Sequence, residues 1–379
     1  MKVVLAIDSF KGSMSSTEAA EAAARGVLSA YPCAENVIIP IADGGEGTTE
    51  AIVSARGGEW CECTVTGPIG EPVCARYGYM AESKTAVMEM SAAAGLPLVP
   101  EDKRNPMYTT TYGVGEMIRD AIARGARSFI IGIGGSATND GGSGMLAALG
   151  FGLKKENGEP IALGALGLAE LSVIELSSAI PELSECEFRV ACDVKNPLCG
   201  KNGASYVYGG QKGADENMKA ELDALLDKFA TATESVIPTA DRCAEGAGAA
   251  GGLGFALLSY LGAKLESGIS LVIEASGLEE HIKSADVVVT GEGRIDGQSY
   301  MGKAPVGVAS LAKKHGKLCV ALAGSVAEDA DGLSEHGIDA VFSILSSPTS
   351  LSEAMKPEVA KRNMENTARR VFSLIKKSR

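Results

Sequence analysis

Hydrophobic positions at the start of the chain form short runs separated by a helical pattern. Residues 3–7 (VVLAI) and 35–42 (ENVIIPIA) predict two strands. The alanine-rich stretch between them predicts a helix, and Ser15 and Glu18 have the spacing of a capping box at its start. A further helix is expected to reach about residue 55. This order, with crossovers of this length, predicts a parallel sheet.

The last hundred residues continue the alternation. The segment GEGRIDGQSYMGK (residues 291–303) predicts a polar loop, and the helix after it is expected to open with Pro305, a favoured first-turn residue. A basic amphipathic helix is expected to close the chain. Strands are predicted at residues 285–291, 317–324 and 340–345.

The middle of the chain has a different pattern. Residues 61–90 alternate apolar and polar side chains between Gly-Pro and Gly-Glu turns, which predicts antiparallel strands. Further strands are expected at RSFII and EFRVACDV, and a helix is expected from Asp215 to Ser235.

Together these patterns predict an α/β protein of two domains. A discontinuous parallel-sheet domain is expected from residues 1–57 and 285–379, and an inserted mixed α/β domain from residues 58–284. The active site is expected in the cleft, against the carboxyl ends of the parallel strands.

The composition narrows the class of protein. A net charge of −13 over 379 residues argues against nucleic acid or an anionic membrane as a partner. Nine scattered cysteines and the lack of a secretory pattern at the start favour the cytoplasm. Three histidines are too few for a histidine metal site or a histidine-based nucleophile triad. The 47 glycines exceed ordinary usage, which indicates loops that hold backbone close to a ligand.

The segment GIGGSATNDGGSG (residues 132–144) follows a predicted strand and runs into a predicted helix. Glycine lets backbone N–H groups approach a ligand, and a helix start adds the positive end of its dipole. The segment therefore predicts an anion or phosphate cradle, although a turn that serves only chain geometry is the alternative. The expected binding residues are Gly134, Gly135, Ser136, Thr138, Asn139, Gly141 and Gly142.

Two glycine patterns fit the dinucleotide-binding fingerprint without its context. Residues 132–137 fit G-x-G-x-x-A, but no acidic residue ends a second strand about 20 residues later. Residues 246–251 fit G-x-G-x-x-G, but the TADRCAE stretch before them is not a strand pattern. Neither segment ends in the Gly-Lys-Ser/Thr of a P-loop.

Five loops at predicted strand ends combine a carboxylate with glycine, hydroxyl or basic residues. A single aspartate after a strand is more often a helix cap than a catalytic group. Five such loops together favour a catalytic site, because a doubly wound fold gathers them at one edge of its sheet. The loops are DSFKGS (8–13), DGGEGT (43–48), GGSATNDGG (134–142), CDVKNP (192–197) and GEGRID (291–296).

These loops contain the groups that phosphoryl transfer from ATP requires. Carboxylates hold Mg²⁺, cations balance the charge of the phosphoryl group, and one carboxylate accepts the proton of the acceptor hydroxyl. Cations beside carboxylates, with few aromatic residues, favour a small anionic acceptor. The candidate metal ligands are Asp8, Asp43, Glu46 and Glu292, and the candidate cations are Lys11, Arg104, Lys195, Lys212, Arg294 and Lys303.

Six segments resemble the glycerate kinase family, of the bacterial glycerate 2-kinase type. They occur in the family's order from the first residue to about residue 325. The resemblance implies ATP- and Mg²⁺-dependent phosphorylation of D-glycerate to 2-phosphoglycerate, in glycerate, glucarate or galactarate breakdown. It also implies one flavodoxin-like and one restriction-enzyme-like domain. The segments are MKVVLAIDSFKGSMSSTEAA, IADGGEGT, NPMYTTTYGVGEMI, GIGGSATNDGGSGML, ACDVKNPLCG and VVTGEGRIDGQSYMGKAPVGVA.

Roles within such a site can be assigned as expectations. Asp193 is expected to accept the proton of the acceptor hydroxyl, because it ends a predicted strand and Lys195, a phosphate-binding candidate, follows two residues later. The alternative role of Asp193 is metal ligation. Lys11 and Arg294 are expected to contact phosphates or the glycerate carboxylate. Loss of either Asp193 or Asp296 is expected to be severe, because neither stands where a surface cap would suffice.

Two other classes of protein share some of these features. A nicotinamide-dependent hydroxyacid oxidoreductase would also use glycine-rich loops, but it needs a ribose-binding acid and usually a catalytic histidine. A non-catalytic anion-binding protein would not need acids in all five loops. The residues leave open whether C2 or C3 of glycerate is phosphorylated, which loop holds ATP, and whether the chain forms a homo-oligomer.

Overall fold

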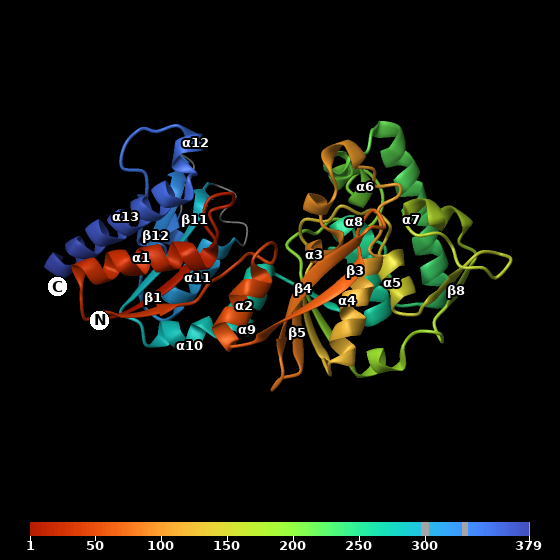
Figure 1. Cartoon of the computed structure of the whole chain (residues 1–379), viewed down its shortest axis with the longest axis horizontal. Coiled ribbons are helices and arrows are strands. Elements are labelled where there is room, and N and C mark those ends of the chain that lie inside the picture. Colours follow the sequence, from red (N-terminus) through yellow and green to blue (C-terminus); the bar gives the residue numbers. More distant parts are fainter. Residues whose placement is uncertain (297–302, 328–332, 379) are drawn as a thin grey trace. The chain divides into compact units, whose positions relative to one another are not determined.

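The computed structural model describes residues 1–296, 303–327 and 333–378. The chain divides into two compact units, each with its own sheet (Figure 1). Unit 1 consists of Met1–Gly57 and Ser267–Arg379, and unit 2 of Gly58–Glu266.

Unit 1 contains a five-stranded parallel sheet in the order β13–β12–β11–β1–β2. Counted in chain order within the unit, this is the order 2-1-3-4-5 of flavodoxin-like sheets. Such sheets bind ligands where the strand order reverses, which here is the carboxyl end of β1 and β11. The strands are β1 (Lys2–Ile7), β2 (Glu35–Ile38), β11 (Val287–Ile295), β12 (Leu318–Val326) and β13 (Ala340–Ser343).

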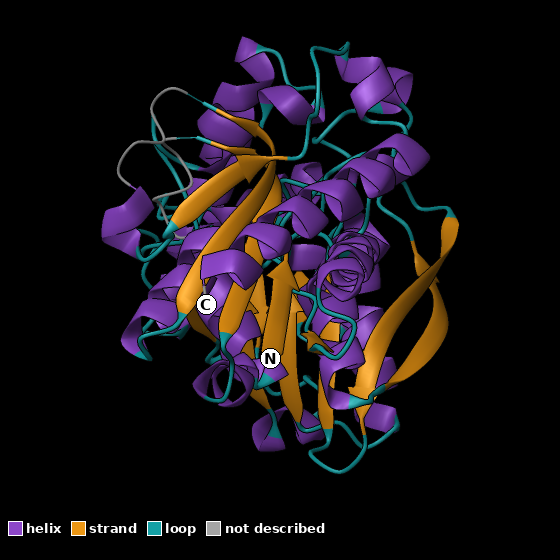
Figure 2. Cartoon of the chain, turned by 90° about the vertical axis from the view of Figure 1, so that its left-hand side faces the viewer, coloured by secondary structure: helices purple, strands orange, loops and turns teal. Residues whose placement is uncertain are grey.

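Helices cover both faces of this sheet (Figure 2). Val3, Leu5 and Ile7 of β1 share one core with α1 and α13, and the alternate residues of β1 point to the opposite face. β1 is fully buried from Val3 to Ile7, as expected for a strand covered on both sides. The helices are α1 (Ser16–Ala30), α2 (Thr48–Arg56), α9 (Gly268–Ser276), α10 (Leu278–Lys283), α11 (Ala304–Lys314), α12 (Leu351–Ala354) and α13 (Pro357–Ser378), with a 3₁₀ turn at Leu333–His336.

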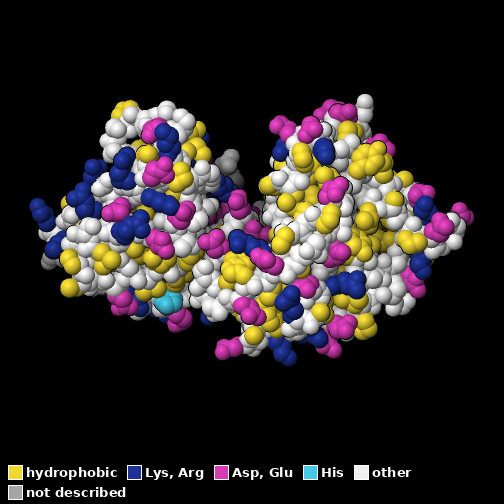
Figure 3. Space-filling model, in the orientation of Figure 1, with side chains coloured by type: hydrophobic (Ala, Val, Ile, Leu, Met, Phe, Trp, Pro, Cys, Tyr) yellow, Lys and Arg dark blue, Asp and Glu magenta, His cyan; other side chains and the backbone are white. Residues whose placement is uncertain are grey.

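The first and last long helices of the chain, α1 and α13, lie side by side (Figure 1). They approach closely at Gly26, where an added Cβ would lie 2.2 Å from the Glu365 carbonyl oxygen. Arg25 forms an ion pair with Glu365 at 3.1 Å on the exposed rim of this contact. Lys and Arg side chains gather over α13 (Figure 3), as expected for a basic amphipathic helix whose other face is buried.

Unit 2 contains a six-stranded mixed sheet in the order β10–β9–β6–β5–β4–β3. Strands β5, β6, β9 and β10 are parallel, and β3–β4–β5 are antiparallel. A separate antiparallel pair joins β7 to β8. The strands are β3 (Glu59–Thr66), β4 (Pro72–Met80), β5 (Thr85–Glu89), β6 (Ser128–Gly132), β7 (Gly152–Lys154), β8 (Val173–Glu175), β9 (Glu187–Ala191) and β10 (Lys264–Glu266).

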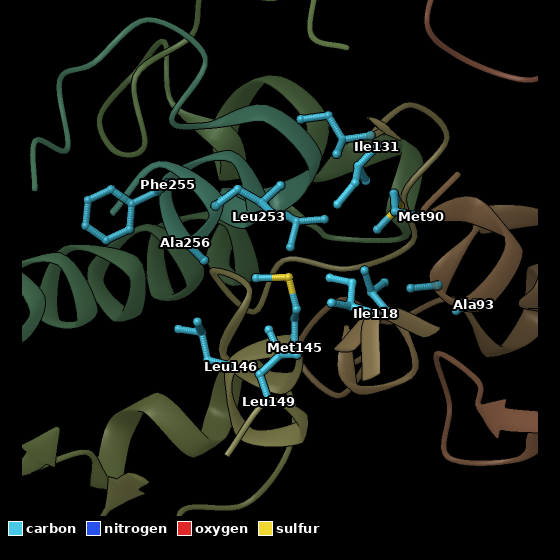
Figure 4. Close-up of a cluster of buried hydrophobic side chains, with 14 of the residues drawn as sticks. Met90, Ala93, Ile118, Ile131, Met145, Leu146, Leu149, Leu253, Phe255 and Ala256 are labelled. Carbon is cyan, nitrogen blue, oxygen red and sulfur yellow. The ribbon is translucent and has the colours of Figure 1, made fainter. Parts of the chain in front are cut away.

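The short helix α5 lies in the middle of the unit 2 core. Met145 and Leu146 of α5 are fully buried, and Met145 points toward Ile118 of α4 and Leu253 of α8 (Figure 4). The helices of the unit are α3 (Ser91–Ala94), α4 (Tyr112–Ala123), α5 (Ser143–Ala148), α6 (Ala204–Tyr208), α7 (Glu216–Val236) and α8 (Ala249–Leu261). Its 3₁₀ turns are Leu96–Leu98, Glu101–Lys103, Ala165–Glu170, Pro181–Glu185 and Gly210–Lys212.

Several predicted local features are confirmed. Ser15 and Glu18 form the capping box of α1, with both reciprocal hydrogen bonds present. The stretch 61–90 is antiparallel, and a proline occupies the first turn of α11. No helix in the described residues has the length and apolarity that a membrane crossing requires.

Two predicted element boundaries are wrong. The strand expected over 35–42 ends at Ile38, just before Pro40, which has no N–H to continue the ladder. The segment GEGRI, predicted as loop, continues β11 and pairs with β12 as far as Ile295. Residues 297–302 of the predicted polar loop lie outside the described residues.

The compact units also differ from the predicted domains at their second boundary. Unit 1 resumes at Ser267, whereas residue 285 was expected. The reason is that α9 packs within unit 1: Arg56 donates to the Ala275 carbonyl at 2.5 Å, and Gly307 of α11 lies against Ile269.

Replacing Gly26 by alanine is expected to destabilise unit 1. In an exposed helix this change stabilises by about 1 kcal/mol, but here the added Cβ meets the Glu365 backbone. We expect the free energy of unfolding to fall by about 1–3 kcal/mol, measured by urea denaturation. Glu21→Ala, on the exposed side of α1, is the control, and a Gly26→Ala protein as stable as that control would contradict the helix contact.

Candidate functional site

A cavity of about 610 Å³ lies at the carboxyl ends of the unit 1 strands. Segments that follow or end β1, β2, β11, β12 and β13 all contribute to its wall. Six residues predicted from sequence as site residues meet here, together with the candidate cation Lys303. The charged lining consists of Asp8, Lys11, Asp43, Glu292, Arg294, Asp296 and Lys303.

Asp8 is the most constrained carboxylate of this cavity. It directly follows β1, and only 6% of its surface is exposed. Burial, together with the negative charges of Asp43 and Glu292, raises the pKa of Asp8 to about 7. The Ser9 N–H, which donates to Asp8 at 2.6 Å, and the charge of Lys11 act in the opposite direction.

The continuation of β11 places three charged residues on one face. Side chains two residues apart on a strand point the same way, so the strand brings Glu292 and Arg294 into line with Asp296. Glu292 is 8% exposed, and Lys303 Nζ lies 3.7 Å from both the Glu292 and Asp296 carboxylates. Arg294 Nε lies 3.3 Å from Asp296 Oδ2. Arg294 and Lys303 therefore share the Asp296 carboxylate.

The loop after β2 contributes Asp43 but not Glu46. Gly45 N–H donates to Asp43 Oδ1 at 3.2 Å, and the first residue of α9 presses on this loop. A Cβ at Gly268 would lie 2.1 Å from the Asp43 carbonyl oxygen, so only glycine allows the approach. Glu46 is exposed and does not line the cavity, unlike the other predicted metal ligands.

The glycine loop of unit 2 is open only at its beginning. Gly134 and Gly135 are exposed, whereas Ser136 and the residues after it are buried. Gly141 N–H donates to the Gly251 carbonyl at 3.0 Å, and Gly142 N–H donates to Asp140 Oδ1 at 3.1 Å. The prediction that these two glycines form an anion cradle needs correction, because their amides already have protein acceptors.

Packing explains why the rest of this loop needs glycine. Added Cβ atoms at Gly141 and Gly142 would meet Phe229 of α7 and Ala256 of α8 at 2.9 and 2.5 Å. Gly251 has a positive φ of 70°, and its Cβ would lie 2.0 Å from the Thr138 carbonyl oxygen. Gly251, the last glycine of the G-x-G-x-x-G pattern of residues 246–251, therefore allows the start of α8 to pack against the loop after β6.

Asp140, which sequence reasoning gave no role, holds this loop from inside. It is fully buried and accepts hydrogen bonds from the N–H and Oγ1 of Thr111, at 2.8 and 2.9 Å, and from two glycine amides. Burial raises the pKa of this carboxyl. Its position between an asparagine and two glycines was the available signal, since such residues favour tight turns.

Lys212 is a second buried residue that binds this loop from inside the protein. Sequence reasoning proposed it as a ligand-facing cation, but it is 1% exposed and donates to the Thr138 carbonyl at 2.6 Å. Burial lowers the pKa of Lys212 to about 7, against the attraction of Asp140. Thr138 Oγ1 and Asn139 Oδ1 are buried without a hydrogen-bond partner among the described residues.

Asp193 and Lys195 lie beyond the end of β9 in unit 2. Both are exposed, and Lys195 forms an ion pair with Glu245 at 3.2 Å in which both side chains are largely solvated. Arg104, the remaining candidate cation, is half-buried in unit 2, and Gly213 packs against its backbone. None of the three lines the unit 1 cavity.

The cavity carboxylates fit a magnesium ion that binds together with a phosphate. Within the described ranges no three His, Cys, Asp or Glu side chains form a ready metal cluster. Magnesium does not require one, because it is usually held by one or two carboxylates with waters and substrate phosphates. Asp8, Asp43 and Glu292 supply such oxygen ligands, and a cation would offset the repulsion that raises the pKa of Asp8.

Comparison with known proteins gives consistent results. The model of the glycerate kinase family matches residues 3–376. Glycerate 2-kinase of Escherichia coli (strain K12) is 50% identical over 356 residues, covering 94% of this chain and 93% of that protein. Glycerate kinase of Bacillus subtilis (strain 168) is 49% identical over 376 residues, covering 99% and 98%. A crystal structure assigned as glycerate kinase 2 from Salmonella typhimurium LT2 matches with a TM-score of 0.90 and 44% identity, covering 100% and 99% of the chains.

Replacing Asp8 by asparagine is expected to stabilise the protein at about pH 8 and to change its stability little at about pH 3, below the ordinary pKa of 3.8. The folded pKa of about 7 lies above the ordinary 3.8, so the folded state binds more protons between these values. The stabilising contribution is fully present below pH 3.8 and is lost progressively as the pH rises from 3.8 to about 7. Asparagine removes that loss, and we expect a gain of at least about 1 kcal/mol at pH 8, measured by thermal unfolding without divalent cations.

The control for this experiment is Glu46→Gln on the neighbouring exposed loop, which should shift the unfolding midpoint little at either pH. Equal midpoints for the wild-type protein and Asp8→Asn at pH 8 would show that Asp8 does not carry a buried charge.

Proposed function

Because this chain belongs to the glycerate kinase family, we propose that it phosphorylates D-glycerate with ATP and Mg²⁺ to give 2-phosphoglycerate. The observation that carries the proposal is the cavity at the strand-order reversal of unit 1, which gathers four carboxylates and three cations. A charge set of this kind suits a transfer in which a metal ion and basic side chains offset the charge of phosphate groups. We place the reaction in the cytoplasm and in the breakdown of glycerate, glucarate or galactarate.

We assign the metal to the carboxylates deepest in the cavity. Asp8, Asp43 and Glu292 would hold Mg²⁺, which when bound supplies positive charge to the phosphate oxygens. Asp8 is the central member, because its burial and its two acidic neighbours leave its negative charge poorly compensated by the described protein groups. Glu46 is left out of this set, since it does not reach the cavity.

The basic residues of the cavity would bind the anionic groups of the reactants. Lys11 is exposed at the cavity wall, and Arg294 and Lys303 stand along β11 and at the start of α11. These side chains would contact phosphate oxygens or the glycerate carboxylate. Asp296 lies near both Arg294 and Lys303, so it would orient the two cations toward the cavity.

Unit 2 would contribute a smaller set of groups. Gly134 and Gly135, the exposed start of its glycine loop, and the hydroxyl of the neighbouring buried Ser136 would bind an anionic group of a reactant. Lys195 would add a cation for phosphate. Asp193 remains the proposed acceptor of the glycerate hydroxyl proton, because an exposed carboxylate at the end of a parallel strand is accessible to a ligand.

The product distinguishes the two hydroxyls of glycerate. With ATP, Mg²⁺ and D-glycerate, coupling to enolase alone should give a signal, because enolase acts on 2-phosphoglycerate. A signal that appears only after a phosphoglycerate mutase is added would assign the reaction to C3. If no ADP forms, the chain does not phosphorylate glycerate.

Single substitutions test the assigned side chains. Lys11→Ala and Asp193→Ala should each lower kcat/KM by more than about tenfold, or about 1.4 kcal/mol of transition-state stabilisation. Steady-state kinetics with both substrates varied provides the measurement. Lys377→Ala on α13 and Glu221→Ala on α7 are the matched controls, since both side chains are exposed and stand on helices outside the proposed site. Activity within about tenfold of wild type in either test variant would remove that residue from the catalytic set.

A further inference from the structure

The unit 1 cavity has a charged side and an apolar side. The charged residues come from β1, β2 and β11 and the segments after them. The apolar residues come mainly from the β13 edge of the sheet: from the end of β13 and from the α12 and α13 segments that follow it. Since β13 is separated from β11 by one strand, the two sides lie about 10 Å apart. The apolar residues include Ile344, Leu345, Leu351, Ala354, Met355 and Ala360.

Glycerate by itself does not account for this cavity. Its three carbons each carry oxygen, so it offers almost no apolar surface to an apolar wall. A volume of about 610 Å³ lies within the roughly 300–1,000 Å³ typical of sites for larger organic ligands. Of the reactants in the proposed transfer, only the nucleotide combines an apolar ring with charged groups.

We propose that the β13–α12 side of the cavity binds the adenosine part of ATP, with the phosphates directed toward the charged residues on β1 and β11. This assignment rests on the proposed kinase function. It answers a question that the sequence left open, namely which loops hold the nucleotide. It places the nucleoside in unit 1, whereas the anion or phosphate cradle predicted from sequence is the glycine loop of unit 2.

The exposure of Leu351 supports a ligand at this wall. Leu351 is 75% exposed, the highest value among the large apolar side chains of the described residues. It stands at the first position of α12, which is held in place by the Ser350 side chain accepting from Glu353 N–H at 3.3 Å. A flat aromatic base against Leu351 would remove this apolar surface from water.

The loop that carries Lys11 connects the apolar wall to the charged residues. An added Cβ at Gly12 would lie 2.9 Å from Met355 Cε, so Met355 packs directly against this loop. The loop is closed by reciprocal hydrogen bonds between Phe10 and Met14, at 2.9 and 3.0 Å. Phe10 therefore lines the cavity beside Lys11 and Asp8, and a nucleotide base on Met355 would have its phosphates near these charged groups.

The described groups of unit 2 offer a poorer nucleoside site. The amides of Gly141 and Gly142 are occupied, and Phe229 and Ala256 cover these glycines. A cavity of about 500 Å³ in unit 2 is lined by Arg189 and Glu266, which already bind each other through two contacts of 2.7 Å. The charged lining of that cavity is limited to Glu187, Arg189, Lys264 and Glu266, whereas the unit 1 cavity gathers four carboxylates and three cations beside its apolar wall.

Photolabelling of the intact chain with 8-azido-ATP tests the assignment without relying on catalysis. We expect the label in residues 344–360 or at Phe10, and we expect ATP but not D-glycerate to prevent it. Label confined to residues 58–266 would overturn the proposal, as would label that excess ATP does not prevent.

A substitution at the wall provides a second test. Leu351→Asn should raise the KM for ATP and the Kd for ADP by about fivefold or more, with kcat and the KM for glycerate within about twofold of wild type. Leu374→Asn is the control, because Leu374 is 63% exposed on α13 and does not line the cavity. Equal effects of both substitutions on ADP binding, or none from Leu351→Asn, would contradict the proposal.

Calorimetry with ADP separates this inference from the proposed function. In one outcome the wild-type chain binds ADP, with an affinity that Leu351→Asn lowers, and still forms no phosphoglycerate. That result would support the nucleoside site and contradict the proposed kinase function. Formation of 2-phosphoglycerate together with photolabel only in unit 2 would support the proposed function and contradict the nucleoside site in unit 1.

Discussion

The burial of Asp8 beside two other carboxylates is the constraint on which the candidate site depends. Its position follows from the fold, because β1 is the strand at which the sheet order reverses and Asp8 is the first residue after it. Burial and like charges make the ionised form of Asp8 unfavourable, which is the direction in which its pKa moves. A protein that keeps such a group accepts a local cost in stability, and a bound cation would remove that cost.

The arrangement of the other charges follows from the same sheet edge. β11 extends beyond the point where its sequence becomes polar, and this extension puts Glu292, Arg294 and Asp296 on one face of the strand. Lys303 then reaches two of these carboxylates from the start of α11. The cations and acids therefore hold one another in place, while Lys11 and the apolar wall of α12 remain available to a ligand.

Unit 2 uses its conspicuous residues differently. Gly141, Gly142 and Gly251 allow the loop after β6 to pack against α7 and α8, and the amides of Ala137, Gly141 and Gly142 are bonded within the protein. Asp140 and Lys212 stabilise this packing from inside. The same glycine content that suggests a ligand cradle in a sequence can thus serve close backbone approach, because both uses require the absence of a Cβ.

The sequence by itself determined the elements and the kinds of chemistry. The capping box of Ser15 and Glu18, the buried run of β1 and the antiparallel stretch 61–90 are local patterns, so they could be predicted from neighbouring residues. The family also follows from motifs in order. Only the tertiary structure decided which candidates meet. Asp8 and Glu292 are far apart in the chain and come together because β1 pairs with β11, whereas Glu46, three residues after Asp43, is exposed and does not line the cavity. Burial of Lys212 is likewise set by packing against distant segments, which no local pattern records.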